Sequence, residues 1–270
     1  MSDELGRLSI IGAGAMGSAF AQGVISRGLY RPEDITLADV DSAKLSQASS
    51  TLGASVTADN AVAVEGARVV LLAVKPSVVP VVLNQIKDKL TADQLLISIA
   101  AGVRIAFIES RLLPQSKVIR AMPNTPCRIG QGAIAYACGS AIDNHDIELA
   151  ERILGAVGVA LQVPEELMNA VTGLSGSGPA YVFVMIDALA DAGVRVGLSR
   201  ETALKLAAQT VMGSARMVLE TGEHPAILKE QVTSPGGTTI CGLEALERGG
   251  FRSALIEAVK AATKRADELG

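Results

Sequence analysis

The sequence predicts an α/β fold in which an N-terminal parallel-sheet domain, residues 1–164, precedes an all-α domain, residues 165–270. Short apolar runs alternate with helical periods from about residue 8 to residue 121, which is typical of a doubly wound sheet. From about Glu165 onward, apolar residues recur mainly at helical spacing. A length of 270 residues also favours about two domains.

The first expected strand, Leu8–Ile11, leads directly into a glycine motif and a helix that ends near Gly28. The motif reads G-A-G-A-M-G, or G-x-G-x-x-G. In this context the first glycine permits a tight turn, the second lets a pyrophosphate approach the backbone, and the third lets the helix pack on the strand. The context predicts a Rossmann-type dinucleotide site formed by Gly12, Ala13, Gly14, Ala15, Met16 and Gly17.

The alternation of strands and helices continues through residue 121. The other expected strands are Ile35–Ala38, Val69–Val74, Leu95–Ile99 and Val118–Ala121. The expected helices are Ser42–Leu52, Val78–Leu90 and Ile105–Leu112. The run at 69–74 is apolar throughout, as a strand buried on both faces should be. Ligands bind at the carboxyl ends of the strands in such sheets, so the residues that follow them are candidates for a site.

Small and amide side chains follow three of these strands. The candidates are Ala73, Val74, Lys75, Pro76, Ala100, Ala101, Gly102 and Asn124. Small residues leave space for a flat ring, and the Asn124 side chain can bond an amide. Two alternatives stay open at this point: Lys75 could be a solvated loop lysine, and Asn124 could bond its own backbone in a turn.

Asp39 ends the second expected strand, about 20 residues past the glycines, where an acid binds the ribose of NAD. A carboxylate there would repel the 2′-phosphate of NADPH. Asp41 is a competing candidate, although it could simply cap the next helix. No arginine follows Asp39 directly, so we expect NADH to be favoured over NADPH.

Composition argues against several classes of function. A net charge of -4 without a basic run disfavours nucleic-acid binding, and aromatic residues at 3% disfavour a base-stacking platform. Three cysteines without a C-x-x-C pair and two isolated histidines predict reduced thiols and no metal site. The apolar runs are too short to span a bilayer, and no signal peptide precedes Leu8. We expect a cytoplasmic protein.

The second half predicts helices. They are Glu165–Val171, Ala180–Val194, Arg200–Glu220, Pro225–Gln231, one that begins at Thr238, and Arg252–Leu269. The G-L-S-G-S-G-P stretch at 173–179 predicts a flexible loop. The helix at 180–194 is apolar around most of its circumference, so it should be buried in a core or against a second subunit. A domain of about a hundred residues has a limited core, so we expect it to dimerise.

A second glycine-rich segment reads V-T-S-P-G-G-T-T-I at 232–240. Pro235, Gly236 and Gly237 prevent a helix, and Thr238 and Thr239 begin one. Free N–H groups, a positive helix dipole and hydroxyls form a cradle for a carboxylate there. The alternative is an ordinary capped helix start.

Six segments together resemble the pyrroline-5-carboxylate reductase family over nearly the whole chain. They are Ile11–Gly17, A-V-K-P at 73–76, S-I-A-A-G at 98–102, M-P-N-T-P at 122–126, G-L-S-G-S-G-P-A-Y at 173–181 and the segment at 232–240. The last two are highly specific. The resemblance implies reduction of 1-pyrroline-5-carboxylate to L-proline with NAD(P)H. It also implies a Rossmann domain followed by a dimerisation domain of interlocking helices, often assembled into rings of dimers.

The resemblance also implies roles for individual residues. Asn60 and the 73–76 segment would line the cofactor site, and Ala100–Gly102 would approach the nicotinamide. Ser234, Gly236, Gly237, Thr238 and Thr239 would hold the substrate, with Thr239 bonding the ring nitrogen, and Glu165 matches an acidic position beside the substrate site. Many family members carry Ser, Asn or Arg after the second strand, where this chain has Asp39-Val40, so a preference for NADPH is not implied.

Three alternatives stay open. A reductase of another cyclic imine would share the carboxylate loop. A beta-hydroxyacid dehydrogenase shares the G-x-G-x-M-G start, but it uses a lysine in a glycine-rich helix, and residues 176–190 contain none. A nucleotide-sensing binding protein would lack turnover, and the Thr-Thr loop argues against that.

Overall fold

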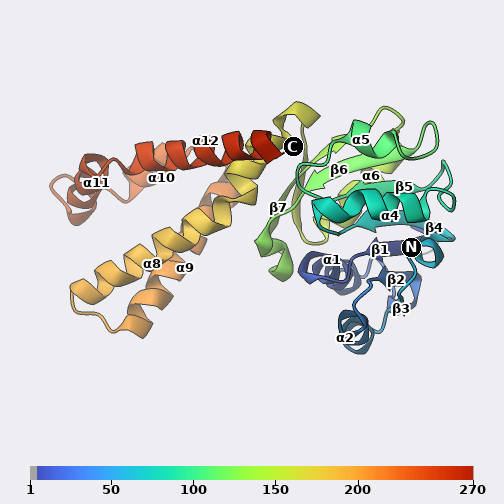
Figure 1. Cartoon of the computed structure of the whole chain (residues 1–270). Helices are drawn as coiled ribbons and strands as arrows, with labels where there is room; N and C mark the ends of the chain where they lie inside the picture. The colour runs from blue at the N-terminus through green and yellow to red at the C-terminus, as the bar shows by residue number, and fades with distance from the viewer. Residues whose placement is uncertain (1–4, 270) are drawn as a thin grey trace. The chain divides into compact units, whose positions relative to one another are not determined.

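The computed structural model describes residues 5–269 and divides the chain into two compact units (Figure 1). Unit 1 is Met1–Ser177 with Ala261–Gly270, and unit 2 is Gly178–Lys260. The boundary expected between residues 164 and 165 lies within unit 1 and stays a prediction about where the sheet domain ends.

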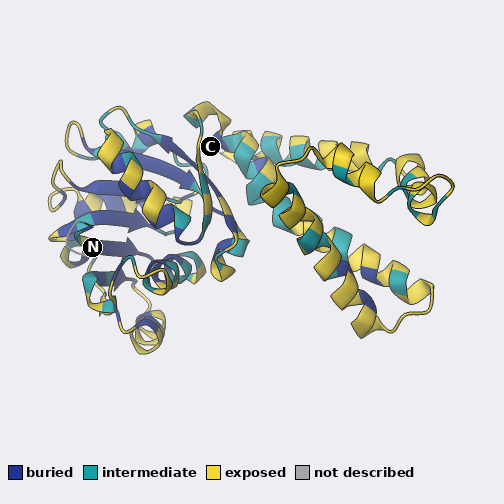
Figure 2. Ribbon diagram, turned by 180° about the vertical axis from the view of Figure 1, so that it is seen from behind, coloured by how far each residue is buried: buried dark blue, intermediate teal, exposed yellow. Residues whose placement is uncertain are grey.

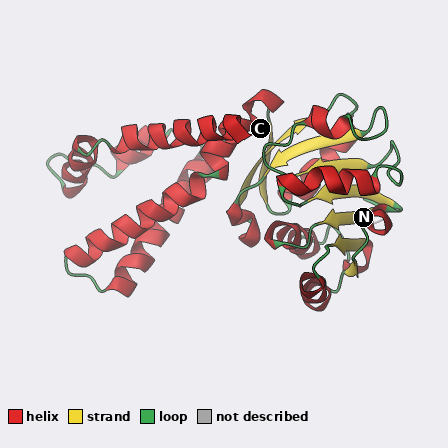
Figure 3. Cartoon of the chain, in the orientation of Figure 1, coloured by secondary structure: helices red, strands yellow, loops and turns green. Residues whose placement is uncertain are grey.

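Unit 1 is built on a β-sheet, whose strands are yellow in Figure 3. The sheet has eight strands in the order β3-β2-β1-β4-β5-β6-β7-β8. The strands are β1 (Arg7–Ile11), β2 (Ile35–Ala38), β3 (Ser55–Thr57), β4 (Ala67–Leu72), β5 (Leu95–Ser98), β6 (Lys117–Met122), β7 (Gly132–Cys138) and β8 (Gly158–Gln162). Neighbours are parallel, except that β7 runs antiparallel to β6. The connection between Met122 and Gly132 is too short for the crossover that a parallel pair requires. The predicted Rossmann-type sheet is confirmed, with this one reversal.

Helices cover both faces of the sheet. One apolar cluster joins the sheet to α1 (Ala15–Ser26), α2 (Ser42–Leu52) and α6 (Asn144–Gly155). The other joins it to α3 (Asn60–Val64), α4 (Val79–Ile86) and α5 (Ile105–Glu109). Successive side chains of a strand point to opposite faces of the sheet. In β5, Leu95 and Ile97 therefore belong to the cluster with α1, α2 and α6, and Leu96 belongs to the cluster with α3, α4 and α5. Each such buried side chain contributes roughly 1.5–3 kcal/mol relative to exposure.

The segment 173–179, predicted as a flexible loop, is helical. The helix α7 (Met168–Val171) continues through a π-helical turn, Thr172–Gly176, and α8 (Gly178–Arg195) follows. Within the turn, Ser177 N donates to Thr172 O at 2.8 Å, and the Thr172 and Ser175 hydroxyls donate to carbonyls one turn back. Gly176 lies so close to Met122 that a Cβ would contact the methionine at 2.8 Å. The small residues therefore allow close helix packing rather than a loop.

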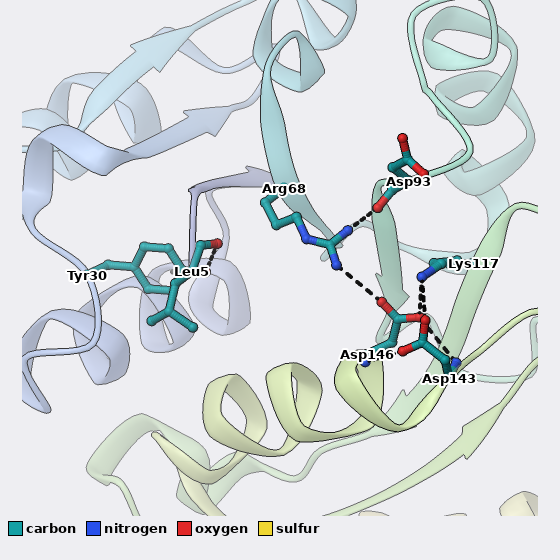
Figure 4. Close-up of polar contacts among 7 residues, drawn as sticks. All are labelled: Leu5, Tyr30, Arg68, Asp93, Lys117, Asp143 and Asp146. Atoms are coloured by element: carbon teal, nitrogen blue, oxygen red, sulfur yellow. Dashed lines mark hydrogen bonds and ion pairs between the residues drawn. The ribbon is translucent and has the colours of Figure 1, made fainter. Parts of the chain in front are cut away.

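An ion-pair network lies at the amino ends of β4 and β6, away from the strand ends where ligands bind (Figure 4). Asp146 is fully buried at the start of α6 and forms ion pairs with Lys117 and Arg68, whose Nζ and Nη2 atoms lie 2.7 Å and 3.5 Å from its carboxylate. Arg68 also donates a hydrogen bond to the Asp93 carbonyl. Asp143 and Asp146 form a reciprocal capping box on α6. Hydrogen bonds to Asp146 and Asp143 raise the pKa of Lys117. The network therefore ties β4, β6 and α6 together at the amino ends of these strands.

Unit 2 consists of helices whose side chains are mostly exposed (Figure 2). It contains α8, α9 (Arg200–Thr221), α10 (Pro225–Gln231), α11 (Thr238–Arg248) and the start of α12 (Phe251–Leu269). The predicted helices are all present. Over residues 178–260 only Ala190, Ala203 and Ala207 are buried, whereas Phe183 is 63% exposed and Val184 70%. The unit therefore has almost no apolar core of its own.

No helix within residues 5–269 is both long and apolar enough to cross a bilayer. Over the same described range, no group of three or more His, Cys, Asp or Glu side chains is arranged to hold a metal ion.

Candidate cofactor and substrate sites

The glycine motif lies between β1 and α1 and has the geometry that the sequence predicts. Gly12 has a φ of +106°, and its N–H donates to the Ala38 carbonyl at 2.7 Å. A Cβ on Gly17 would collide with the Gly12 carbonyl. A Cβ on Gly14 would meet nothing within 4 Å, so the backbone there faces open space at the start of a helix with no side-chain cap. This arrangement suits an anion such as a pyrophosphate.

Beside the motif lies a cavity of about 290 Å³ at the carboxyl ends of β1, β2 and β4. Its lining includes seven of the residues predicted for the cofactor: Gly12, Gly14, Asp39, Asn60, Ala73, Val74 and Lys75. A second hollow of about 400 Å³, between α1 and α2, shares Gly14 and Lys44 with the first. It adds the predicted Ala13 and Ala15. The glycine motif therefore contributes to the lining of both cavities.

Asp39 is fixed at the end of β2. Its Oδ2 accepts the Ala13 N–H at 2.9 Å, and its Oδ1 accepts the Asp41 N–H at 3.0 Å. Asp41 instead caps α2, where its carboxylate accepts the N–H groups of Ala43 and Lys44 and these bonds lower its pKa. Of the two acids that the sequence offered for the ribose, Asp39 lines the cavity and Asp41 caps a helix.

The other predicted cofactor residues differ in their burial and in their hydrogen-bond partners. Asn60 begins α3, and its amide donates to Gln85 Oε1 at 2.7 Å. Ala100 is buried in the core, whereas Ala101 is exposed and Gly102 has a φ of +75°. Asn124 bridges two segments, since its Nδ2 donates to Ser175 O at 3.0 Å and its Oδ1 accepts the Ala133 N–H at 3.0 Å. Its amide bonds distant backbone rather than its own turn.

The remaining cofactor candidates are Met16, Gly17 and Pro76. Met16 packs against the core, Gly17 is buried in α1, and Pro76 begins a short 3-10 turn after Lys75. These three residues shape the backbone around the cavity and are absent from its lining.

Glu165 is engaged in a contact that the sequence did not suggest. Its Oε1 accepts the Ile105 N–H at 2.8 Å and the Arg120 guanidinium at 3.2 Å. Arg120 lies in β6 with a side chain only 6% exposed, while that of Glu165 is 31% exposed. Sequence reasoning missed Arg120, although an arginine inside an apolar strand pattern, V-I-R-A, is a recognisable signal of a buried pair.

The Thr-Thr loop belongs to unit 2 and forms a separate group of candidate residues. Gly236 has a φ of +66°, and the Gly237 N–H donates to Ser234 O at 3.1 Å. Gly237 is the N-cap of α11, and no side-chain hydrogen bond caps this helix. Thr238 and Thr239 therefore enter the first turn, and neither hydroxyl serves as the cap. The helix start offers free N–H groups next to two hydroxyls.

Comparisons with known proteins point to one family over nearly the whole chain. Residues 165–269 match the family model "Pyrroline-5-carboxylate reductase dimerisation", and residues 7–102 match "NADP oxidoreductase coenzyme F420-dependent". A pyrroline-5-carboxylate reductase of Methanosarcina acetivorans is 48% identical over 98% of both chains. The structure of a Coxiella burnetii pyrroline-5-carboxylate reductase aligns with a TM-score of 0.94 at 39% identity, covering 98% of this chain and 99% of that one.

The chain belongs to the pyrroline-5-carboxylate reductase family.

The resemblance in the six sequence segments is thus confirmed, as is the fold class of a Rossmann-type domain followed by helices. A Plasmodium falciparum pyrroline carboxylate reductase, solved with NADP bound, aligns with a TM-score of 0.86 at 33% identity over 98% of each chain. As a member of the pyrroline-5-carboxylate reductase family, the chain is an oxidoreductase that uses a nicotinamide cofactor.

Family membership also accounts for the bare surface of unit 2. The match to the dimerisation model covers all the helices of that unit, from α8 through α12. Exposed Phe183, Val184 and Leu206 are the kind of apolar surface that a second copy would cover. Self-association of this pyrroline-5-carboxylate reductase family member follows from both observations.

Proposed function

We propose that the chain reduces 1-pyrroline-5-carboxylate to L-proline by hydride transfer from NADH or NADPH, the last step of proline biosynthesis. The observation that supports this most directly is the V-T-S-P-G-G-T-T-I loop at the uncapped start of α11, in a chain of this family. Its free N–H groups would hold the substrate carboxylate, because a helix N-terminus favours an anion.

The chemistry requires little acid–base work from the protein. A nicotinamide cofactor supplies the hydride when it is bound. The ring C=N of the substrate accepts hydride well once its nitrogen is protonated, and the transfer then discharges the cation. Thr239 would orient that nitrogen with its hydroxyl, and the loop would hold the ring in place. A carbonyl reductase would instead need a proton donor for the new alkoxide.

We expect the cofactor site to favour NADH, because Asp39 presents a carboxylate at the end of β2 that repels a 2′-phosphate. Asp39→Asn keeps an acceptor for the Ala13 N–H and removes the charge, so it should raise kcat/KM for NADPH relative to NADH. An unchanged ratio of kcat/KM for NADPH to that for NADH in Asp39→Asn would show that Asp39 does not repel the phosphate.

The proposal includes a cytoplasmic homodimer, with rings of dimers as a further level of assembly. Three cysteines without a disulfide, Cys127, Cys138 and Cys241, suit a reducing compartment. The apolar surface of unit 2 suits the pairing of two copies.

The deciding experiment is a steady-state assay of NADH and NADPH oxidation with 1-pyrroline-5-carboxylate. The six-membered cyclic imine carboxylate and a beta-hydroxyacid with the oxidised cofactors serve as competing substrates. We expect the five-membered imine to give the highest kcat/KM. Faster turnover of the larger ring or of the hydroxyacid would replace the proposal with one of those activities, and binding without turnover would indicate a nucleotide sensor.

A further inference from the structure

Lys44 lies beside Asp39 and has no role in the sequence analysis. It is in the first turn of α2, and its Nζ is 3.6 Å from Oδ2 of Asp39 and 3.6 Å from Oδ2 of Asp41. It lines both cavities that meet at Gly14, and its side chain is 45% exposed. A cation therefore stands next to the carboxylate expected to read the adenosine ribose.

The two charged groups differ in freedom. Asp39 is 11% exposed and accepts one backbone N–H on each oxygen, so turning it away would break both bonds. Lys44 is 3.6 Å from each carboxylate, longer than the 2.7–3.2 Å of an N–H···O hydrogen bond. It is attracted without being hydrogen-bonded, and its own side chain is 45% exposed, so water screens the attraction and the pair contributes little. The ammonium can therefore turn toward another anion at small cost.

Other cations near the cavities are less well placed. Lys75 lines the same cavity but follows β4, which is separated from β2 by β1 in the sheet. Arg128 lines only the hollow between α1 and α2. Among the described residues that line these two cavities, Lys44 is the cation that also pairs with Asp39.

We infer that Lys44 is the specificity-determining residue that admits the 2′-phosphate of NADPH beside Asp39. Without it, the Asp39 carboxylate would face a dianionic phosphate with no cation beside it. With it, the charge of Asp39 is offset, and an ammonium is available to pair with the phosphate oxygens. The chain then accepts both cofactors, and Lys44 contributes only to NADPH. The inference rests on the dinucleotide site of the proposed function.

The test is calorimetric titration of the full-length protein with adenosine 2′,5′-bisphosphate and with 5′-AMP, which differ only in the 2′-phosphate. Lys44→Ala removes the ammonium, Lys44→Arg restores a cation, and Lys89→Ala removes an exposed lysine that pairs with Glu65 elsewhere. We expect Lys44→Ala to weaken the bisphosphate roughly three- to tenfold and 5′-AMP less than twofold, since a partly exposed charged contact is lost. Lys44→Arg should recover most of the loss, and Lys89→Ala should change neither probe.

Equal weakening of both probes by Lys44→Ala, or no weakening of either, would overturn the inference. In turnover assays of the same variant, kcat/KM should fall for NADPH and stay constant for NADH. The binding result does not depend on the imine. Failure of the wild type to reduce imine would therefore reject the proposed function, while an active enzyme with equal probe losses would reject only the role of Lys44.

Discussion

The ion pair between Arg120 and Glu165 allows a decisive test of what Glu165 does. The family resemblance places Glu165 beside the substrate, whereas the structure engages it with a buried arginine and the Ile105 N–H. Glu165→Gln keeps an oxygen for Ile105 but removes the counter-charge of a guanidinium whose side chain is 6% exposed. Breaking such a buried pair costs about 3–5 kcal/mol because a charge is left uncompensated.

The opposite substitution should cost less. Arg120→Met leaves Glu165, which is 31% exposed and keeps its bond to Ile105, so water compensates part of the loss. We expect about 1–3 kcal/mol for Arg120→Met, the usual penalty for an incompletely satisfied polar group. The double variant should cost clearly less than the sum of the two, because it leaves no buried charge without a partner.

The assay is urea unfolding followed by far-UV circular dichroism at one fixed protein concentration, since association also contributes to stability. Glu166→Gln is the matched control, because Glu166 is exposed and adjacent in the chain. Steady-state kinetics on the same samples provide the second measurement. The reasoning would be refuted if Glu165→Gln were as stable as Glu166→Gln, and a loss of imine turnover at unchanged stability would place Glu165 at the substrate instead.

Four other substitutions test separate features. Thr239→Val should lower kcat/KM for the imine by the equivalent of about 1–3 kcal/mol without changing the cofactor Kd, and unchanged kinetics would leave the hydroxyl no role in catalysis. Met185→Lys should weaken self-association and activity together in light scattering and kinetics, and a fully active 27.8 kDa wild-type monomer would contradict this. Ser9→Ala should raise the free energy of unfolding by about 1 kcal/mol, because the fully buried Ser9 hydroxyl has no partner within the described residues; destabilisation would count against that account. Hydrogen bonds from the Lys117 ammonium, the larger cause, and from the Asp146 N–H lower the pKa of Asp143 from 3.8 to about 2. The contribution of ionised Asp143 to the stability of the fold is therefore present above pH 3.8 and is lost as the pH falls toward 2. The difference in Tm between wild type and Asp143→Asn should shrink over that range, and a constant difference would exclude this linkage.

The sequence predicts the elements whose period is strong. The strands at Leu8–Ile11 and Leu95–Ile99 and the helices of unit 2 lie close to their expected ranges, because apolar residues recur there at the spacing that burial requires. The three-residue β3 and five-residue α3 are too short to show a period. The helix α6 was missed although its capping box, Asp143 with Asp146, is a signal visible in the sequence.

The site is less completely predictable than the fold. The glycine motif and Asp39 were proposed from the sequence because their expected roles depend on local backbone geometry and a fixed separation, and they line the cavity at the ends of β1 and β2. Arg120 was not proposed, because its partner Glu165 lies 45 residues away and only the folded chain brings the two together. The stretch at 173–179 shows the same limit, since its glycines permit close packing against Met122 that composition alone cannot distinguish from a loop.

Unit 2 buries only three alanine side chains, so its thermal stability should depend on protein concentration. A unit with so little interior of its own cannot hold its helices together by internal packing, so partner contacts must supply that stability. Loss of the partner and melting of the helices would then be one event. Its midpoint temperature should rise with total protein concentration, as mass action requires for a dimer whose separated subunits do not stay folded.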